Sequence, residues 1–135
     1  MTNDTFRQAR SDMSEEQKIN GTGLARLKRA LSCSSAGISA AWTNEEAFRQ
    51  ELCAAVVLIP LACWLGDSGV ERALLVGSLL LVILVELVNT AVEVVVDRIG
   101  VDRHTLSGLA KDLGSAAVSM ALLHAAAIWL LVLFT

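Results

Sequence analysis

The stretch that most constrains the fold runs from Ala73 to Val96 and is long and apolar enough to cross a bilayer as a helix. It nevertheless carries Glu86, Asn89 and Glu93, and Asp97 follows just past its end. At about 100° per residue, these four side chains fall within an arc of roughly 80° on one helix face. Because an ionisable group inside a span costs about 3 kcal/mol on insertion scales, these acids are not expected to face lipid. We expect this acidic stripe, as the four residues are called below, to face protein, water or a bound cation.

Residue chemistry alone leaves more than one interpretation of the acidic stripe open. One interpretation is a structural role, in which polar side chains hydrogen-bond between neighbouring helices, and Asn89 alone could supply such a contact. A cation channel or a proton relay would also place acids in a span. Acids stacked on one face and running out to a water-side aspartate are more typical of a site for metal and substrate.

The rest of the chain predicts an all-α membrane protein with one domain. Hydrophobic residues make up 54% of its 135 residues and are concentrated in long continuous stretches. Residues 1–21 are predicted to be a polar extension, without the apolar core of a signal peptide, and residues 22–135 a membrane-embedded domain. Within that domain we predict an amphipathic surface helix at about 23–45, which could break near Ser34, Ser35 and Gly37, and spans at about 46–65, 73–96 and 113–134.

The positions of lysine and arginine predict the orientation in the membrane. Seven of them precede or begin the first span, three lie in the predicted loop after the second span, and Arg72 alone lies in the short 66–72 turn. The N-terminus and the 97–112 loop should therefore be cytoplasmic, and the C-terminus should face the other side. The net charge of −3 provides no basic field that would attract nucleic acid.

This orientation opens the acidic stripe towards the cytoplasm, beside the basic residues Arg98, Arg103 and Lys111. Carboxylates hold Mg²⁺ and its waters, basic side chains offset phosphate charge, and a carboxylate can take a proton from an attacking hydroxyl. The set suits phosphoryl transfer from a nucleotide to an alcohol at the membrane surface. The sequence contains neither the P-loop motif nor the HRD and DFG motifs of soluble kinases, so nucleotide binding here would need a different architecture.

Three strings closely resemble the bacterial integral-membrane diacylglycerol kinase family: ELVNTAVEVVVDR from Glu86, HTLSGLAKDLGSAA from His104 and AWTNEEAFRQE from Ala41. The resemblance runs from about Thr22 to the C-terminus. It implies a homotrimer of three-span subunits in the bacterial inner membrane, with a periplasmic C-terminus, active sites shared between subunits and a surface helix that shields them. It also implies transfer of the γ-phosphate of MgATP to sn-1,2-diacylglycerol, giving phosphatidic acid and ADP, with membrane lipids but no nucleic acid as partners.

The same resemblance implies roles for individual residues. Glu86 matches the general base on the lipid hydroxyl, and Glu45 and Glu93 match carboxylates that hold Mg²⁺, although Glu45 by itself would be interpreted as a helix-capping charge. Asn89 and Asp97 would complete the site. Nucleotide contacts are implied for Arg26, Cys33 (aromatic in the family), Glu45, Glu93, Asp102, Arg103, His104, Lys111 and Asp112. Lipid contacts are implied for Arg26, Ala47, Phe48, Arg49, Gln50, Glu51, Trp64, Arg72, Glu86 and Ser115.

The sequence leaves three alternatives to a diacylglycerol kinase open. A kinase of the same fold could use undecaprenol as its acceptor. A non-enzymatic cation channel or transporter subunit would use the same acids for ion flux, so that ATP would be irrelevant. A structural helical oligomer would use Asn89 to set the register of its helices, and Glu86→Gln would then leave every activity intact.

Overall fold

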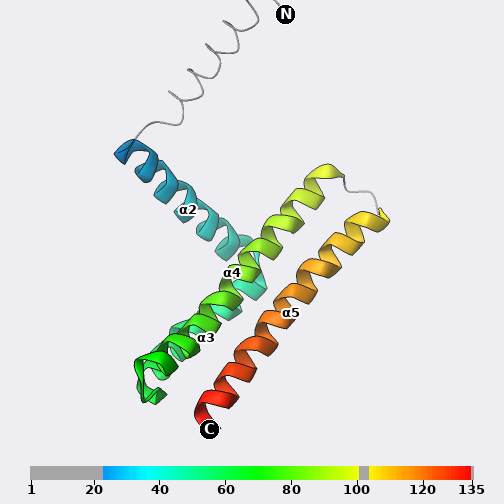
Figure 1. Ribbon diagram of the computed structural model, residues 1–135. Coiled ribbons are helices and arrows are strands. Elements are labelled where there is room, and N and C mark those ends of the chain that lie inside the picture. Colours follow the sequence, from blue (N-terminus) through cyan, green and yellow to red (C-terminus); the bar gives the residue numbers. More distant parts are fainter. Residues whose placement is uncertain (1–22, 101–103, 135) are drawn as a thin grey trace, which may run out of the picture. The chain divides into compact units, whose positions relative to one another are not determined.

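The structure, a computed structural model, describes residues 23–100 and 104–134, and all the regular secondary structure in these residues is helical. The predicted all-α class is therefore confirmed. The elements are α2 (Leu24–Asn44), α3 (Glu46–Leu65), α4 (Gly69–Ile99) and α5 (Thr105–Phe134), as Figure 1 shows. The predicted extension 1–21 lies outside the described residues.

The chain divides into two units, residues 1–40 and residues 41–135. The described part of the first unit is the N-terminal part of α2, which is one uninterrupted helix. The break considered near Ser34, Ser35 and Gly37 is therefore wrong. Serine and glycine lower helix propensity by at most about 1 kcal/mol each, which the surrounding alanines and leucines offset.

The helices α3, α4 and α5 are each long and apolar enough to cross a membrane. The three predicted spans are confirmed as helices, but two of them extend beyond their apolar stretches. The predicted loop at 97–112 is largely wrong, because α4 continues to Ile99 and α5 already begins at Thr105. Apolar runs mark where a bilayer can end, whereas Leu, Ala, Lys and Arg continue a helix beyond that boundary at little cost.

A tight connection joins α3 to α4 and makes the two helices antiparallel (Figure 1). Ser68 caps α4: its Oγ accepts from the backbone N–H of Glu71 at 3.2 Å and donates to the Glu71 carboxylate at 2.9 Å. The same carboxylate accepts from the backbone N–H of Asp67 at 2.8 Å, and Arg72 Nε donates to the carbonyl of Gly66 at 2.9 Å. This is a capping box extended by one arginine, and it fixes where α4 begins.

In the second unit, α4 packs against both α3 and α5. The buried residues of α3 and α5 include several alanines, and the buried residues of α4 include Leu75 and Val82. Val82, Ala121 and Ala125 form one core cluster. Small side chains of this kind let membrane helices approach closely. The polar residues of α4 are thereby brought against neighbouring helices.

Candidate active site

The acidic stripe of α4 runs from the protein interior to its surface. Glu86 is only 3% exposed and Asn89 is 9% exposed, whereas Glu93 is half-buried and Asp97 is exposed. The expectation that the acids of the span avoid lipid is confirmed for Glu86 within a single chain. A buried carboxylate in an apolar helix is expensive, so its retention is typical of a functional site.

Glu86 lies among other carboxylates from two helices. Its charge is repelled by those of Glu93 and Glu45, and it in turn repels the charge of Glu51. We call Glu45, Glu51, Glu86 and Glu93 the carboxylate cluster. Sequence reasoning grouped three of these acids and placed Glu51 only among the lipid contacts. Like charges gathered in a partly buried place are unfavourable unless a cation or a proton compensates them.

Glu45 is the residue that immediately precedes α3, in the N-cap position. Its backbone N–H donates to the carbonyl of Ala41 at 2.8 Å, but its side chain makes no capping hydrogen bond. The side chain of Glu45 therefore forms no cap, while its position at the N-terminus of α3 still suits the predicted capping charge. Its carboxylate is not used for capping and contributes to the repulsion at Glu86.

Asn89 connects the stripe to α5. Its Nδ2 donates to Glu93 Oε1 at 3.1 Å, while its buried Oδ1 has no hydrogen-bond partner among the described residues. That Oδ1 lies directly against Gly114 of α5, where there is no side chain. The amide thus orients one carboxylate of the cluster and keeps an acceptor unused.

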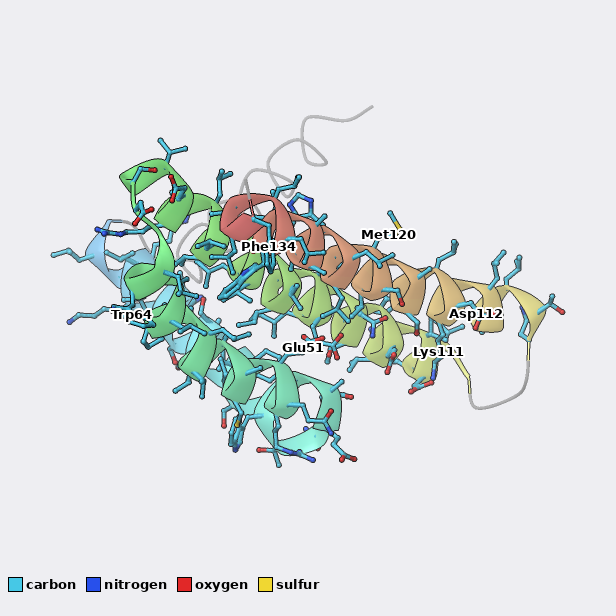
Figure 2. The ribbon with its side chains drawn as sticks, turned by 90° about the horizontal axis from the view of Figure 1, so that it is seen from below. Glu51, Trp64, Lys111, Asp112, Met120 and Phe134 are labelled. Atoms are coloured by element: carbon cyan, nitrogen blue, oxygen red, sulfur yellow. The ribbon has the colours of Figure 1, made fainter. Side chains whose placement is uncertain are left out.

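At the exposed end of the stripe, Lys111 of α5 reaches back to α4. Its Nζ lies 2.6 Å from Asp97 Oδ1, and it is also attracted by the charge of Glu93. Figure 2 shows Lys111 and its neighbour Asp112 at this end of the two helices. The structure therefore brings Lys111, a predicted nucleotide contact on another helix, to the stripe.

The other predicted nucleotide contacts are placed less directly. His104 stands just before α5, where its Nδ1 accepts from the backbone N–H of Leu106 at 3.2 Å. Arg26 and Cys33 belong to the first unit, and Cys33 is an exposed free cysteine. Asp102 and Arg103 lie outside the described residues.

The predicted lipid contacts divide into groups. Trp64 and Arg72 lie at the α3–α4 connection, and at 1.5 Å per residue the axis of α4 separates Arg72 from Glu86 by roughly 21 Å. Phe48 is 1% exposed, so its side chain serves packing. The Arg49 guanidinium donates to the carbonyls of Trp42 at 3.0 Å and Thr43 at 3.3 Å, which ties the end of α2 to α3.

The remaining lipid candidates are accessible or polar. Gln50 donates to the carboxylate of Glu46 at 3.2 Å, and Ala47 and Ser115 are exposed. Among these candidates outside the stripe, Glu51 interacts with it electrostatically, because its carboxylate is repelled by that of Glu86.

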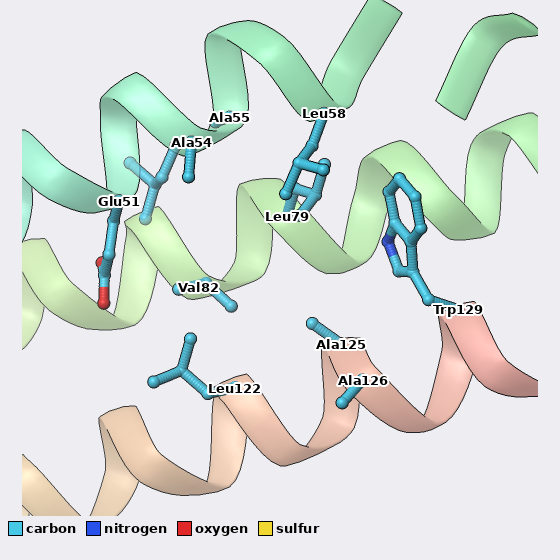
Figure 3. Close-up of a pocket in the computed structure, with 11 residues that line it drawn as sticks. Glu51, Ala54, Ala55, Leu58, Leu79, Val82, Leu122, Ala125, Ala126 and Trp129 are labelled. Atoms are coloured by element: carbon cyan, nitrogen blue, oxygen red, sulfur yellow. The ribbon is translucent and has the colours of Figure 1, made fainter. Parts of the chain in front are cut away.

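A cavity of about 240 Å³ lies between α3, α4 and α5, with almost entirely apolar walls. Figure 3 shows Glu51 towards one end of this cavity and Trp129 towards the other. Glu51 Oε2 and Trp129 Nε1 are buried without hydrogen-bond partners among the described residues. Sequence reasoning missed this cavity and the part of Trp129 in it, because the walls come from three helices. They are Glu51, Ala54, Ala55, Leu58, Leu79, Val82, Ile83, Leu122, Ala125, Ala126 and Trp129.

A metal would find oxygen donors in the carboxylate cluster. In the described residues, no three His, Cys, Asp or Glu side chains are grouped so as to hold a metal ion by themselves. Mg²⁺, however, is commonly bound by one or two carboxylates together with substrate phosphates and water. The donor set therefore fits a Mg²⁺ ion that arrives with a nucleotide, and not one held by the protein alone.

Comparison with known proteins agrees with this chemistry. Residues 32–133 match the family described as prokaryotic diacylglycerol kinase. The Escherichia coli K12 protein named diacylglycerol kinase is 47% identical over 116 residues, which cover 86% of this chain and 95% of that protein. Its Haemophilus influenzae namesake is 49% identical, with 84% and 96% covered, and the one from Pseudomonas aeruginosa is 47% identical, with 83% and 91% covered.

Proposed function

The chain belongs to the prokaryotic diacylglycerol kinase family, and on that premise we propose that it transfers the γ-phosphate of MgATP to the hydroxyl of diacylglycerol. The products are phosphatidic acid and ADP. The observation that carries the proposal is the buried Glu86, 3% exposed, whose charge is repelled by those of Glu93 on α4 and of Glu45 just before α3. Such an arrangement offers both a base for a hydroxyl and oxygen donors for a nucleotide-bound cation.

Glu86 is the proposed general base. Its carboxylate takes the proton of the lipid hydroxyl as that oxygen attacks the γ-phosphorus and the bond to the leaving ADP oxygen breaks. Uptake of the proton cancels one negative charge, which reduces the repulsion from Glu93 and Glu45. Burial keeps bulk water away from the attacking hydroxyl, so that transfer to water is disfavoured.

Glu45 and Glu93 are the residues proposed to hold Mg²⁺, and when bound this ion offsets the charge of the transferring phosphate. Asn89 supports Glu93 through its 3.1 Å hydrogen bond. Lys111 is attracted by Glu93 and paired with Asp97, which suits a cation that moves onto nucleotide phosphates. The other nucleotide and lipid contacts named from the sequence remain proposals of the family resemblance.

The cavity beside Glu51 is the proposed place for the apolar part of the acceptor. Its walls are almost entirely hydrocarbon, and Glu51 brings its one carboxylate close to the charge of Glu86. A lipid whose chain enters the cavity would leave its hydroxyl at the carboxylate cluster. This geometry favours an acceptor with a polar head and a flexible apolar chain.

The proposed assembly is a homotrimer in the inner membrane, with a cytoplasmic N-terminus and with α2 lying on the membrane surface. Apolar residues at helical spacing and a basic cluster in α2 support the surface position. The face of α4 between Leu84 and Val96 carries an apolar groove, which supports packing against another copy. Residues 1–21 are proposed to be an extension and residues 22–135 the kinase domain.

Parallel acceptor assays test the proposal. The full chain, purified in detergent, is mixed with MgATP labelled on the γ-phosphate and with either diacylglycerol or undecaprenol, and label in the extracted lipid is counted. Label in phosphatidic acid, lost when EDTA removes Mg²⁺, is the expected result. Label only in the polyprenol would replace the acceptor, and no label in either lipid from a folded oligomer would favour an ion channel.

A further inference from the structure

Gly114 of α5 faces Asn89 of α4 at unusually close range. A Cβ atom at Gly114 would overlap the Oδ1 of Asn89 and would lie 3.3 Å from its Cγ. The same Cβ would stand 3.9 Å from the Asn89 Cα, which is an ordinary van der Waals distance. The helices themselves therefore have room for an alanine at position 114, and only the amide of Asn89 lacks it.

The orientation of that amide matters to the carboxylate cluster. Asn89 is 9% exposed, its Nδ2 donates to Glu93 Oε1 at 3.1 Å, and its buried Oδ1 occupies the space beside Gly114. Because Oδ1 and Nδ2 belong to one rigid planar group, displacing the oxygen also moves the donor. A side chain at position 114 would thus disturb the hydrogen bond to Glu93 without touching Glu93.

We infer that Gly114 is a positioning residue. Because it has no side chain, it leaves room for the Asn89 amide in the orientation that donates to Glu93. Glu93 is then oriented before any metal arrives. The part of this inference that concerns metal rests on the proposed function of Glu93. The part that concerns the amide rests on the contact between α4 and α5 alone.

The alternative is that Gly114 only permits close helix packing. Gly108 provides the matched comparison, because it lies on the same helix and a Cβ there meets nothing within 4 Å. Gly114→Ala and Gly108→Ala add the same methyl group to α5, and in both cases alanine is the better helix former. They differ in whether that methyl group meets Asn89.

Two measurements that do not depend on turnover test the inference. The chain has four asparagines, so selective ¹⁵N labelling of the full-length oligomer gives few side-chain amide signals, and loss of one in Asn89→Ala assigns it. Binding of Mn²⁺ with a non-hydrolysable ATP analogue is followed by electron paramagnetic resonance. Gly114→Ala should shift the Asn89 signals and weaken Mn²⁺ binding about tenfold or more, as loss of an outer-shell partner does. Gly108→Ala should do neither.

A double substitution separates positioning from packing. In the Asn89→Ala background, Gly114→Ala should weaken Mn²⁺ binding no further, because no amide remains to be displaced. An equal loss in both backgrounds, or unchanged Asn89 signals in Gly114→Ala, would overturn the inference. If Gly114→Ala did not assemble, Asn89→Ala must still weaken Mn²⁺ binding about tenfold, and unchanged binding would overturn it.

The result also distinguishes this inference from the proposed function. Absence of kinase activity in the wild-type protein would count against the proposed function, while the amide signals and Mn²⁺ binding could still support the positioning role. Conversely, an active wild-type kinase in which Gly114→Ala behaves like Gly108→Ala would overturn the positioning role alone.

Discussion

Replacing Glu86 with glutamine should change activity and stability in opposite directions. The substitution preserves the size of the side chain but removes a charge that is 3% exposed and repelled by Glu93 and Glu45. If Glu86 is the general base, phosphorylation of diacylglycerol should fall by about 10²- to 10⁴-fold. The folded state, relieved of like-charge repulsion, should become more stable.

The size of that relief follows from the position of the acids on α4. Glu86 and Glu93 are two turns apart, so roughly 10 Å of helix axis separates them, and at an effective dielectric of about 20 their repulsion is about 1.6 kcal/mol. Glu45 adds a further contribution of the same sign. The free energy of unfolding of Glu86→Gln should therefore rise by about 1–2 kcal/mol.

The assay pairs kinase turnover with thermal unfolding of the same detergent-solubilised preparation. Glu46→Gln is the matched control, because Glu46 is an exposed acid next to Glu45 that we place outside the site, and its activity should match the wild type. An active Glu86→Gln protein would refute the assignment of the base. A less stable Glu86→Gln protein would refute the like-charge argument.

Three further substitutions probe other parts of the structure. Lys111→Met should raise the KM for ATP severalfold but leave the thermal midpoint nearly unchanged, because its ion pair with Asp97 is solvent-exposed; a large loss of stability would contradict this. Ser68→Ala removes the cap of α4 and should cost about 1 kcal/mol of stability with turnover intact, and an unchanged denaturation midpoint would argue against the cap. Ala126→Leu narrows the cavity and should raise the KM for diacylglycerol but not the KM for ATP. Ala127 lies outside the cavity lining, so Ala127→Leu should leave the KM for diacylglycerol unchanged. The same KM for diacylglycerol in the two variants would argue against a lipid in the cavity.

The sequence was sufficient for features that depend on one helix at a time. The common face of Glu86, Asn89 and Glu93 follows from the helical period, and the burial of Glu86 follows from the cost of exposing an acid to lipid. The three apolar runs likewise predicted α3, α4 and α5.

Features that join different helices could not be predicted in the same way. The cavity combines Glu51 with Trp129, which are 78 residues apart, and the contact of Asn89 with Gly114 depends on how α5 packs on α4. The C-terminal end of α4 and the start of α5 were also missed. Hydropathy indicates where a segment leaves the bilayer, but it does not indicate where its helix ends. Local patterns carry no information on such distances between helices.

Product stoichiometry tests the central claim most directly. The purified full chain is incubated with MgATP and diacylglycerol, and ³¹P nuclear magnetic resonance follows nucleotide and lipid phosphorus in one sample. Our account predicts that phosphatidic acid and ADP appear in equal amounts and that inorganic phosphate does not. ATP converted to ADP and inorganic phosphate without phosphatidic acid, or nucleotide left unchanged by a folded oligomer, would contradict it.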